Sequence, residues 1–244
     1  MVYEGAIEAL GKASPDLEFE LVSTTVDYTL EQYDASMEML WEGALLAMAG
    51  LSAFAANDIK ALMVMPSFSN PLGSNMPDEN KEALYRLLAE FDVPVIEDDI
   101  YGDLHFGERR PKPLKAWDTD GRVLLCSSFG KTLAPSLRVG WCAPGRYLER
   151  VRRLKFTNTL GTPVVLQKTV SDFLRNGGYD HHLRSIRRAY HHQLHLFSQA
   201  ILRHFPEGTR LSRPEGGFVL WVKLPPGVDT LRLHREALRQ HITT

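Results

Sequence analysis

Short apolar runs that stop at turn residues alternate with amphipathic segments through the middle of the chain. The runs 61–67 (ALMVMPS), 93–99 (VPVIEDD) and 122–128 (RVLLCSS) are short and mostly apolar, which is typical of buried strands. Residues 78–91 repeat leucines at helical spacing, and a fourth apolar run, 137–144, follows the third. Short strands separated by helices predict an α/β fold with a mainly parallel sheet and helices on both of its faces.

The pattern changes toward both ends of the chain. The first sixty residues are the least regular, although 36–55 is rich in Ala, Leu and Met and favours a helix. Apolar residues recur at steps of three and four over 179–205, which predicts one long amphipathic helix. A turn, a strand and a final helix over 228–242 follow it. We therefore expect a large domain over residues 1–180 and part of a small α+β domain over 181–244.

Composition and charge narrow the function classes. The chain of 244 residues is 44% hydrophobic and 24% charged, as ordinary globular proteins are. Its net charge of −2 gives no general electrostatic reason to bind nucleic acid or an acidic membrane. It has no secretory signal pattern at its start and no membrane-length apolar run. Cys126 and Cys142 are too few for a disulfide framework, so we expect buried free thiols in a reducing cytoplasm.

The first candidate for chemistry is Gly130-Lys131-Thr132, which looks like the end of a phosphate-binding P-loop. A P-loop needs a glycine five residues before its Gly-Lys pair, because backbone amides must wrap the phosphates. That position holds Leu125, inside an apolar run, so the chain does not match an NTP site. A lysine at a strand end can instead form a Schiff base with a carbonyl cofactor such as pyridoxal phosphate.

Polar residues that such a cofactor would need follow the predicted strands. Ligands of parallel sheets bind at the carboxyl ends of the strands, where Asn70, Asp98 and Lys131 all fall. The pyridine nitrogen calls for a carboxylate, the phenolic oxygen for hydrogen-bond donors, and the phosphate for hydroxyls, amides and a cation. The residues that would serve are Asp98 for the nitrogen, Asn70 and Tyr101 for the phenolic oxygen, and Ser128 and Arg138 for the phosphate. Taken singly, Asn70 could be a turn former, and Asp98 and Arg138 exposed charges.

Four motifs resemble a known family in order and spacing. They are SNPLG (69–73), IEDDIYGDL (96–104), SSFGKTLAPSLRVGW (127–141) and RPEGGFVLW (213–221). Together they resemble the fold-type I, class I/II aminotransferases that depend on pyridoxal 5'-phosphate. The resemblance is strongest to the aminotransferase-like domain of MocR-type regulators of the GntR family, and runs from about residue 61 to about 224.

The resemblance implies a role for each residue of the candidate site. Lys131 is the lysine that forms an aldimine with pyridoxal phosphate and then moves the substrate's α-proton. Asp98 is the partner of the pyridinium nitrogen. Gly130 stands where relatives often have a second phosphate-binding serine, so backbone amides would contribute more here. The remaining implied cofactor contacts are Asn70 and Tyr101 at the phenolic oxygen, and Ser128 and Arg138 at the phosphate.

Two functions follow from the resemblance. One is an aminotransferase that moves amino groups between amino acids and 2-oxo acids, as a cytoplasmic homodimer. The alternative is the effector-sensing domain of a transcriptional regulator, with little or no turnover and no DNA contact from this chain itself. Relatives carry a phosphate-binding turn upstream, an arginine for the substrate carboxylate near their C-terminus and, in the regulators, a winged helix. We expect these parts to lie outside this chain.

Other conspicuous residues have simpler interpretations. Strand alternation places Glu97 and Asp99 on the opposite face from Asp98, so we expect them to be structural. Gly216 and Gly217 suggest tight packing at the start of a strand. Five histidines within 181–195 come without a cysteine or acid to complete a metal site, and indicate a solvated helix face.

Overall fold

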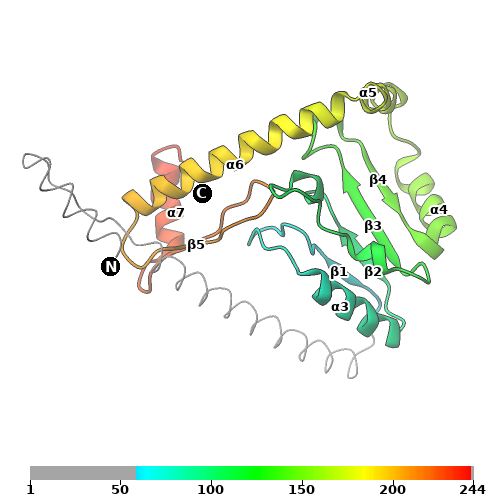
Figure 1. Cartoon of the computed structure of the whole chain (residues 1–244), viewed down its shortest axis with the longest axis horizontal. Coiled ribbons are helices and arrows are strands. Elements are labelled where there is room, and N and C mark those ends of the chain that lie inside the picture. Colours follow the sequence, from blue (N-terminus) through cyan, green and yellow to red (C-terminus); the bar gives the residue numbers. More distant parts are fainter. Residues whose placement is uncertain (1–58, 243–244) are drawn as a thin grey trace, which may run out of the picture. The chain divides into compact units, whose positions relative to one another are not determined.

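A four-stranded sheet forms the centre of the fold (Figure 1). The computed structural model describes residues 59–242, which belong to one compact unit. The predicted helix at 36–55 lies outside the described residues. The predicted domain boundary at residue 180 falls within a continuous helix and stays a prediction.

The sheet confirms the α/β fold with mainly parallel strands. Its strands run in the order β1 (Leu62–Val64), β2 (Val95–Asp98), β3 (Val123–Ser128) and β4 (Gly140–Ala143). The first three are parallel to one another, and β4 pairs with β3 in the antiparallel direction. Because β4 runs back along β3, its first residues lie at the same sheet edge as the last residues of β3.

Helix α3 (Asp78–Glu90) follows the predicted bounds and begins with two acidic residues, which suit the positive end of a helix dipole. It buries Tyr85 and Leu88, and also Lys81, which the apolar pattern did not indicate. The Lys81 ammonium donates to Ser67 Oγ (3.1 Å) and to the Lys112 carbonyl (2.8 Å). Burial lowers the pKa of Lys81, because the charged form loses water.

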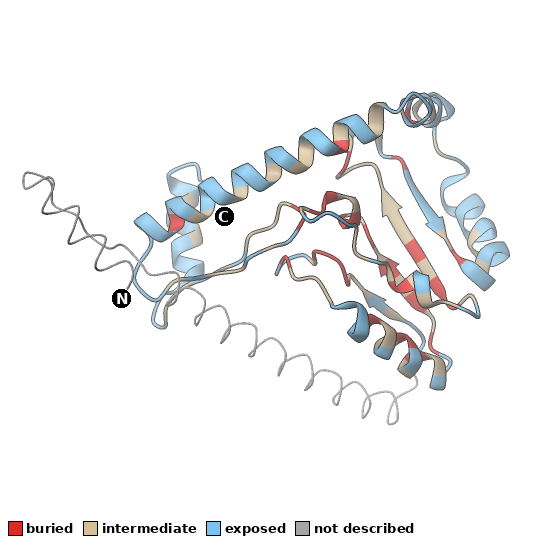
Figure 2. Cartoon of the chain, viewed as in Figure 1, coloured by how far each residue is buried: buried red, intermediate tan, exposed pale blue. Residues whose placement is uncertain are grey.

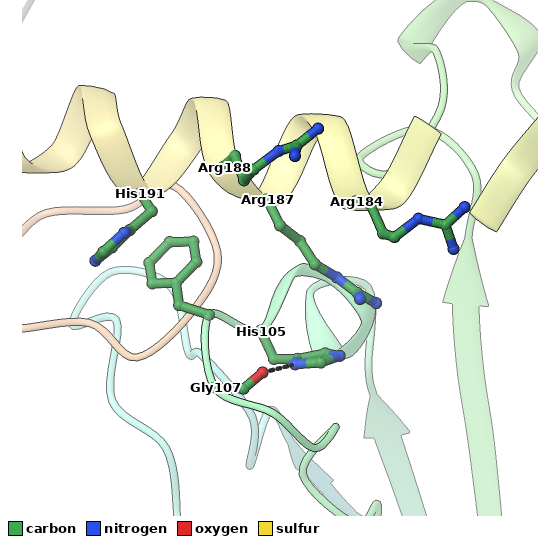
Figure 3. A pocket seen from close by; sticks show the side chains of 7 residues that line it. His105, Gly107, Arg184, Arg187, Arg188 and His191 are labelled. Carbon is green, nitrogen blue, oxygen red and sulfur yellow. Dashed lines mark hydrogen bonds between the residues drawn. The ribbon is translucent and has the colours of Figure 1, made fainter. Parts of the chain in front are cut away.

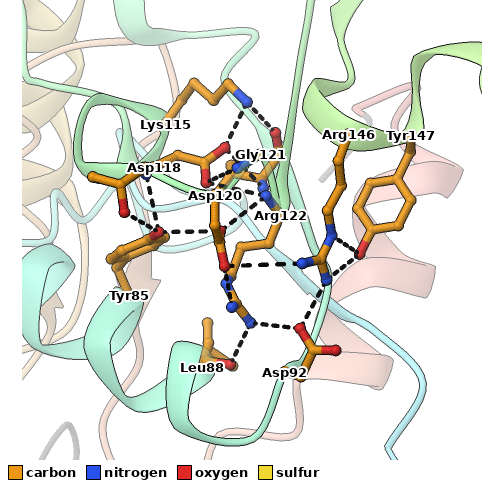
Figure 4. A network of polar contacts seen from close by, with 12 residues as sticks. Tyr85, Leu88, Asp92, Lys115, Asp118, Asp120, Gly121, Arg122, Arg146 and Tyr147 are labelled. Carbon is orange, nitrogen blue, oxygen red and sulfur yellow. Dashed lines mark hydrogen bonds and ion pairs between the residues drawn. The ribbon is translucent and has the colours of Figure 1, made fainter.

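A polar network holds the turn before β3 (Figure 4). The carboxylate of Asp118 accepts the Lys115 ammonium at 2.6 Å and the backbone N–H of Arg122 at 3.0 Å. The buried Arg122 guanidinium pairs with Asp120, whose Oδ1 also accepts the Tyr85 hydroxyl at 3.2 Å. The start of β3 is therefore held by charged groups whose hydrogen bonds satisfy one another.

The remaining elements alternate short turns with helices. Helix α6 (Gly178–His204) confirms the predicted long helix, and it begins after Gly177, which has a left-handed backbone (φ 68°). Helix α7 begins at the side chain of Asp229, which accepts two backbone N–H groups of its first turn. These elements are η1 (Gly102–Leu104), η2 (Leu114–Trp117), η3 (Pro135–Leu137), η4 (Gly145–Tyr147), α4 (Leu148–Thr159), α5 (Val164–Arg175), α6 (Gly178–His204), β5 (Arg210–Leu211), β6 (Val222–Lys223) and α7 (Thr230–Arg239).

Buried residues concentrate in the sheet and at its carboxyl edge (Figure 2). One apolar cluster joins Phe68 after β1, Tyr101 and Leu104 after β2, and Leu183 of α6. Part of the apolar stripe of α6 stays open, since Phe197 is 61% exposed. No described helix is both long and apolar enough to cross a membrane.

The expectation that both cysteines are buried is wrong. Both thiols are free, but Cys142 is exposed and Cys126 is half-buried. Cys142 lies on β4, the last strand in the sheet order, where Gly140 and Trp141 are exposed as well. Among the described residues β4 is paired on one side only, and the apolar run of such a strand does not guarantee burial.

Candidate active site

The carboxyl ends of the parallel strands place the candidate residues at one edge of the sheet. Asp98 is the last residue of β2, and Ser128 is the last residue of β3. Lys131 follows β3 by three residues. Antiparallel pairing sets Ser128 opposite Gly140, which returns Arg138 to the same edge. The sequence separation of ten residues between Ser128 and Arg138 is therefore closed by the turn between β3 and β4.

Asp98 presents a half-buried carboxylate at the end of β2. Its Oδ1 accepts the backbone N–H of Ile100 at 3.3 Å. Burial raises the pKa of Asp98, and the hydrogen bond from Ile100 acts in the opposite direction. A carboxylate in this setting gains from a cationic partner, because a positive charge offsets the lost hydration.

Tyr101 connects Asp98 with Asn70. The Tyr101 ring is only 2% exposed, and the Asn70 side chain lies close enough to its hydroxyl to influence its pKa. Burial raises the pKa of Tyr101, the Asp98 charge raises it further, and the polar side chain of Asn70 lowers it. The phenol therefore keeps its proton at neutral pH and can donate. Gly73 ends the Asn70 turn at φ 71°, where a Cβ atom would lie 3.0 Å from the Val219 carbonyl oxygen.

Phe218 brings Lys131 and Tyr101 together. The Tyr101 and Phe218 rings meet edge to face, with centroids 5.2 Å apart. The Lys131 ammonium lies 5.9 Å from the centroid of the same Phe218 ring, within the range of a cation–π contact. Sequence reasoning did not name Phe218 as a site residue, although it closes the RPEGGF part of the fourth motif.

The turn between β3 and β4 carries Ser128, Lys131 and Arg138. The backbone N–H of Phe129 donates to the Val139 carbonyl at 3.0 Å and closes the turn. A Cβ atom on Gly130 would lie 3.6 Å from Ser128 Oγ, so the glycine keeps the space beside this hydroxyl open. Arg138 has a left-handed backbone (φ 49°) and an exposed side chain that forms no ion pair with any residue from 59 to 242. This conformation costs a non-glycine residue about 1–2 kcal/mol.

A polar network joins the segments that follow β2 and β3. The Asp99 carboxylate pairs with Arg110, whose Nε also donates to Asp103 Oδ1 at 2.7 Å. Tyr179 of α6 donates to Thr132 Oγ1 at 2.8 Å and reaches Asp103 Oδ2 at 3.3 Å. Burial raises the pKa of Tyr179 to about 12. This network connects the neighbour of Asp98 with the neighbour of Lys131, and sequence reasoning missed its members Arg110, Thr132 and Tyr179.

Glu97 and Asp99 make structural contacts, as the strand alternation predicts. Glu97 is fully buried and accepts the backbone N–H groups of Leu114 (2.6 Å) and Lys115 (2.8 Å). Gly216 also packs tightly, since a Cβ atom there would lie 2.5 Å from the Phe68 ring. These residues shape the surroundings of the site.

Two surface cavities lie apart from the candidate residues. The first, of about 290 Å³, is lined by residues 105–107 and by Arg184, Arg187, Arg188 and His191 of α6. Figure 3 shows that the three guanidinium groups do not converge on one point. The second, of about 500 Å³, is lined by residues of the turn after Lys131 and of α5. None of the six predicted site residues lines either cavity.

The α6 histidines lie mainly on the solvated side of the helix. His181, His191, His192 and His195 are exposed, and His182 is half-buried. Within residues 59–242, no group of three or more His, Cys, Asp or Glu side chains is placed to hold a metal ion.

Comparisons with known proteins assign the family. A family model described as aminotransferase class I and II matches residues 41–243. The chain belongs to this family. It is 41% identical over 184 residues to YjiR, an uncharacterized HTH-type transcriptional regulator of Escherichia coli, covering 75% of this chain and 39% of the regulator. It is 30% identical over 185 residues to aromatic-amino-acid aminotransferase 1 of Thermococcus litoralis, covering 75% of this chain and 44% of that enzyme.

A solved structure of the family shares the fold. LysN, the α-aminoadipate aminotransferase of Thermus thermophilus, was solved in complex with N-(5'-phosphopyridoxyl)-L-leucine. It superimposes with a TM-score of 0.74 at 30% identity, over 80% of this chain and 51% of LysN. The chain thus spans about half the length of this aminotransferase, and less than half of the two relatives above.

Proposed function

We propose that this class I/II aminotransferase chain binds pyridoxal 5'-phosphate covalently through Lys131. The observation that carries the proposal is the arrangement around Phe218, whose ring has Lys131 over it and packs edge to face with Tyr101. The Tyr101 hydroxyl in turn lies near the Asn70 side chain and the Asp98 carboxylate, both of which influence its pKa. An amine, a phenol, an amide and a carboxylate are therefore grouped at one sheet edge.

The side chains present match the chemical groups of this cofactor. Asp98 would hold a proton on the pyridine nitrogen, since its half-buried carboxylate favours a cationic neighbour. Asn70 and Tyr101 would donate to the phenolic oxygen. Ser128 and Arg138 would bind the phosphate, because a hydroxyl and a guanidinium are both suited to phosphate oxygens. We propose that these five residues, together with Lys131, form the cofactor site.

The reaction that this site supports best is amino-group transfer between amino acids and 2-oxo acids. The bound cofactor supplies an electron-accepting ring. The Lys131 amine, released from the cofactor, would act as the base that takes the α-proton of the amino acid and delivers it to the C4′ carbon of the cofactor. Support comes from the family match and from relatives named as aminotransferases. We also propose that the protein is a homodimer, on the basis of its membership of this family.

Covalent trapping tests the Lys131 assignment. Protein is incubated with pyridoxal 5'-phosphate, reduced with borohydride, digested with trypsin and analysed by mass spectrometry. An adduct on Lys131 blocks cleavage there, so it should appear in the peptide 123–138. Lys131→Ala should abolish this adduct and the accompanying absorption band, whereas Lys168→Ala, at an exposed position of α5, should keep both. An adduct spread over many surface lysines, or unchanged in Lys131→Ala, would refute the proposal.

A second function is favoured by the 41% identity to an HTH-type transcriptional regulator. In this alternative the same site binds the cofactor and an amino acid effector but turns over little. The two functions separate when the cofactor-loaded protein is mixed with amino acids. Stoichiometric release of a 2-oxo acid supports the aminotransferase, whereas a saturable spectral change without that product supports effector sensing.

A further inference from the structure

Two thiols face each other across the sheet beside the candidate site. Cys126 of β3 is paired in register with Cys142 of β4. Their Sγ atoms are 3.6 Å apart. On its other side Cys126 is in register with Asp98 of β2, so the three residues form one row across the sheet.

The backbone geometry at this pair suits a disulfide. In an antiparallel ladder, hydrogen-bonded pairs alternate with narrower, non-hydrogen-bonded pairs whose Cα atoms are about 4.5 Å apart. Phe129 N–H donates to the Val139 carbonyl, so the pair 129/139 is hydrogen-bonded. Every second pair along the ladder is hydrogen-bonded, which includes 127/141 and 125/143. The pair 126/142 lies between these two and is therefore a narrow pair. The Cys126 carbonyl confirms this by accepting the N–H of Asp99, the residue that follows β2, on the side away from β4. Disulfides span Cα separations of about 4.4–6.8 Å, which include the narrow pair.

The two thiols differ in access. Cys142 is exposed on β4, the last strand of the sheet within residues 59–242, whereas Cys126 is half-buried. Burial raises the pKa of the Cys126 thiol to about 12, and the neighbouring Cys142 raises it as well. Cys142 is therefore the thiol that meets an oxidant first, and Cys126 is placed to resolve the product.

We propose that Cys126 and Cys142 form a modification site, at which exchange with a low-molecular-weight disulfide such as glutathione disulfide produces a reversible cross-strand bond. The Cys142 thiolate attacks one glutathione sulfur, breaks its S–S bond and releases one glutathione thiolate. Cys126 then attacks the Cys142 sulfur, forms the protein disulfide and releases the second glutathione. Two protein thiols are oxidised and one glutathione disulfide is reduced to two thiols, which take up the two protons.

The bond would link the strands that carry Ser128 and Arg138. It lies two residues before Ser128 and four residues after Arg138, at the base of the turn that holds Lys131. A disulfide between these strands should stabilise the folded protein, because it reduces the conformational entropy of the unfolded chain. The oxidised protein should unfold at a higher urea concentration than the reduced protein.

Peptide mapping of the native protein tests the site. The chain is incubated with glutathione disulfide, its remaining thiols are blocked with N-ethylmaleimide, and it is digested with trypsin without reductant. The expected product links peptide 123–131 with peptide 139–146, and dithiothreitol should separate them. Cys126→Ser should stop at a glutathione adduct on Cys142. Cys142→Ser should take up much less glutathione, because only the half-buried thiol remains.

Three results would overturn the proposal. One is a wild-type protein that accumulates the Cys142 adduct as Cys126→Ser does. Another is a disulfide between two chains, visible as a reducible dimer on a gel. The third is a linkage that forms only in urea, which would show that the folded geometry does not bring the thiols together. Because both serine variants retain Lys131, the borohydride adduct reports separately on the proposed cofactor site.

Discussion

Gly216 lies against the ring of Phe68 with no space for a side chain between them. A Cβ atom on Gly216 would come within 2.5 Å of two carbons of that ring, and Phe68 is 1% exposed. The backbone on either side of Gly216 is held as well, since Phe106 N–H donates to the Glu215 carbonyl (2.8 Å) and Gly217 N–H to the Leu104 carbonyl (3.0 Å). The segment that carries Phe218 is thereby fastened to the carboxyl edge of the sheet.

Gly216→Ala should therefore destabilise the protein. Overpacking a buried contact costs about 1–3 kcal/mol, because neither Phe68 nor the paired backbone can move freely. The free energy of unfolding from urea titration measures the effect. Gly107→Ala is the matched control, since a Cβ atom there has no neighbour within 4 Å, and we expect a change within about 0.5 kcal/mol. Equal stabilities for the two variants would contradict the packing.

Asp98→Asn should weaken the proposed binding of pyridoxal 5'-phosphate. The amide keeps the size of the side chain but removes the charge that would hold a proton on the pyridine nitrogen. A hydrogen bond to a charged group contributes about 1.5–3 kcal/mol, which corresponds to roughly 10–100-fold in affinity. Absorbance titration with the cofactor measures this change. Asp172→Asn, at an exposed acid of α5, should bind as the wild type does. An unchanged affinity in Asp98→Asn would remove Asp98 from the site.

Arg110→Ala should be strongly destabilising, because it leaves the buried Asp99 carboxylate without its partner. Removing one member of a buried ion pair costs about 3–5 kcal/mol. Burial raises the pKa of Asp99, and Arg110 opposes that rise, so the variant should lose more stability as the pH increases. Urea unfolding at several pH values measures both effects.

A second substitution separates the lost charge pair from the lost volume. Asp99→Asn in the Arg110→Ala background should recover part of the stability, because a neutral amide costs less to bury than a carboxylate. Arg86→Ala is the surface control, since that guanidinium is 74% exposed in its pair with Glu82 and should contribute less than about 1 kcal/mol. If Arg110→Ala and Arg86→Ala lost equal stability, the buried Asp99–Arg110 pair would contribute no more than the exposed pair, which would contradict the prediction.

Asp120→Asn should change how stability depends on acid pH. The hydrogen bond from Arg122 lowers the pKa of Asp120 from 3.8 to about 2. A lowered folded-state pKa means that the unfolded chain binds more protons in this window, so this stabilisation is complete above pH 3.8 and is lost as the pH falls through about 2. The stability difference between wild type and variant should therefore be largest near neutral pH and shrink toward pH 2.

The comparison of urea midpoints from pH 7 downward tests this pH dependence. Subtracting the variant from the wild type cancels the contributions of Glu97, Asp98 and Asp99, whose pKa values are raised and whose pH dependence has the opposite sign. A difference that stays constant from neutral to acid pH would show that the Asp120–Arg122 pair does not govern it.

Much of the fold follows from local patterns. Continuous apolar runs predicted the four strands of the central sheet, and apolar spacing predicted α3 and α6. The position of Asn70, Asp98 and Lys131 after strands indicated a shared edge, because parallel strands end on the same side of a sheet. Leu125 stands where a P-loop has its first glycine, so the local sequence alone excludes a P-loop. The assignment of the six cofactor contacts stays a prediction for the trapping and titration experiments.

The sequence by itself determined the main strands and helices, the polar residues that follow the strands, and the family motifs. These features depend on residues that are neighbours along the chain. Only the tertiary structure decided that β4 runs back along β3 and sets Cys142 opposite Cys126. Only it paired Asp99 with Arg110, buried Lys81, and brought Phe218 to Tyr101 and Lys131. Periodicity reports which face of an element avoids water, but pairings between distant residues depend on strand register and on charges that are stable in the interior only when a partner is within reach.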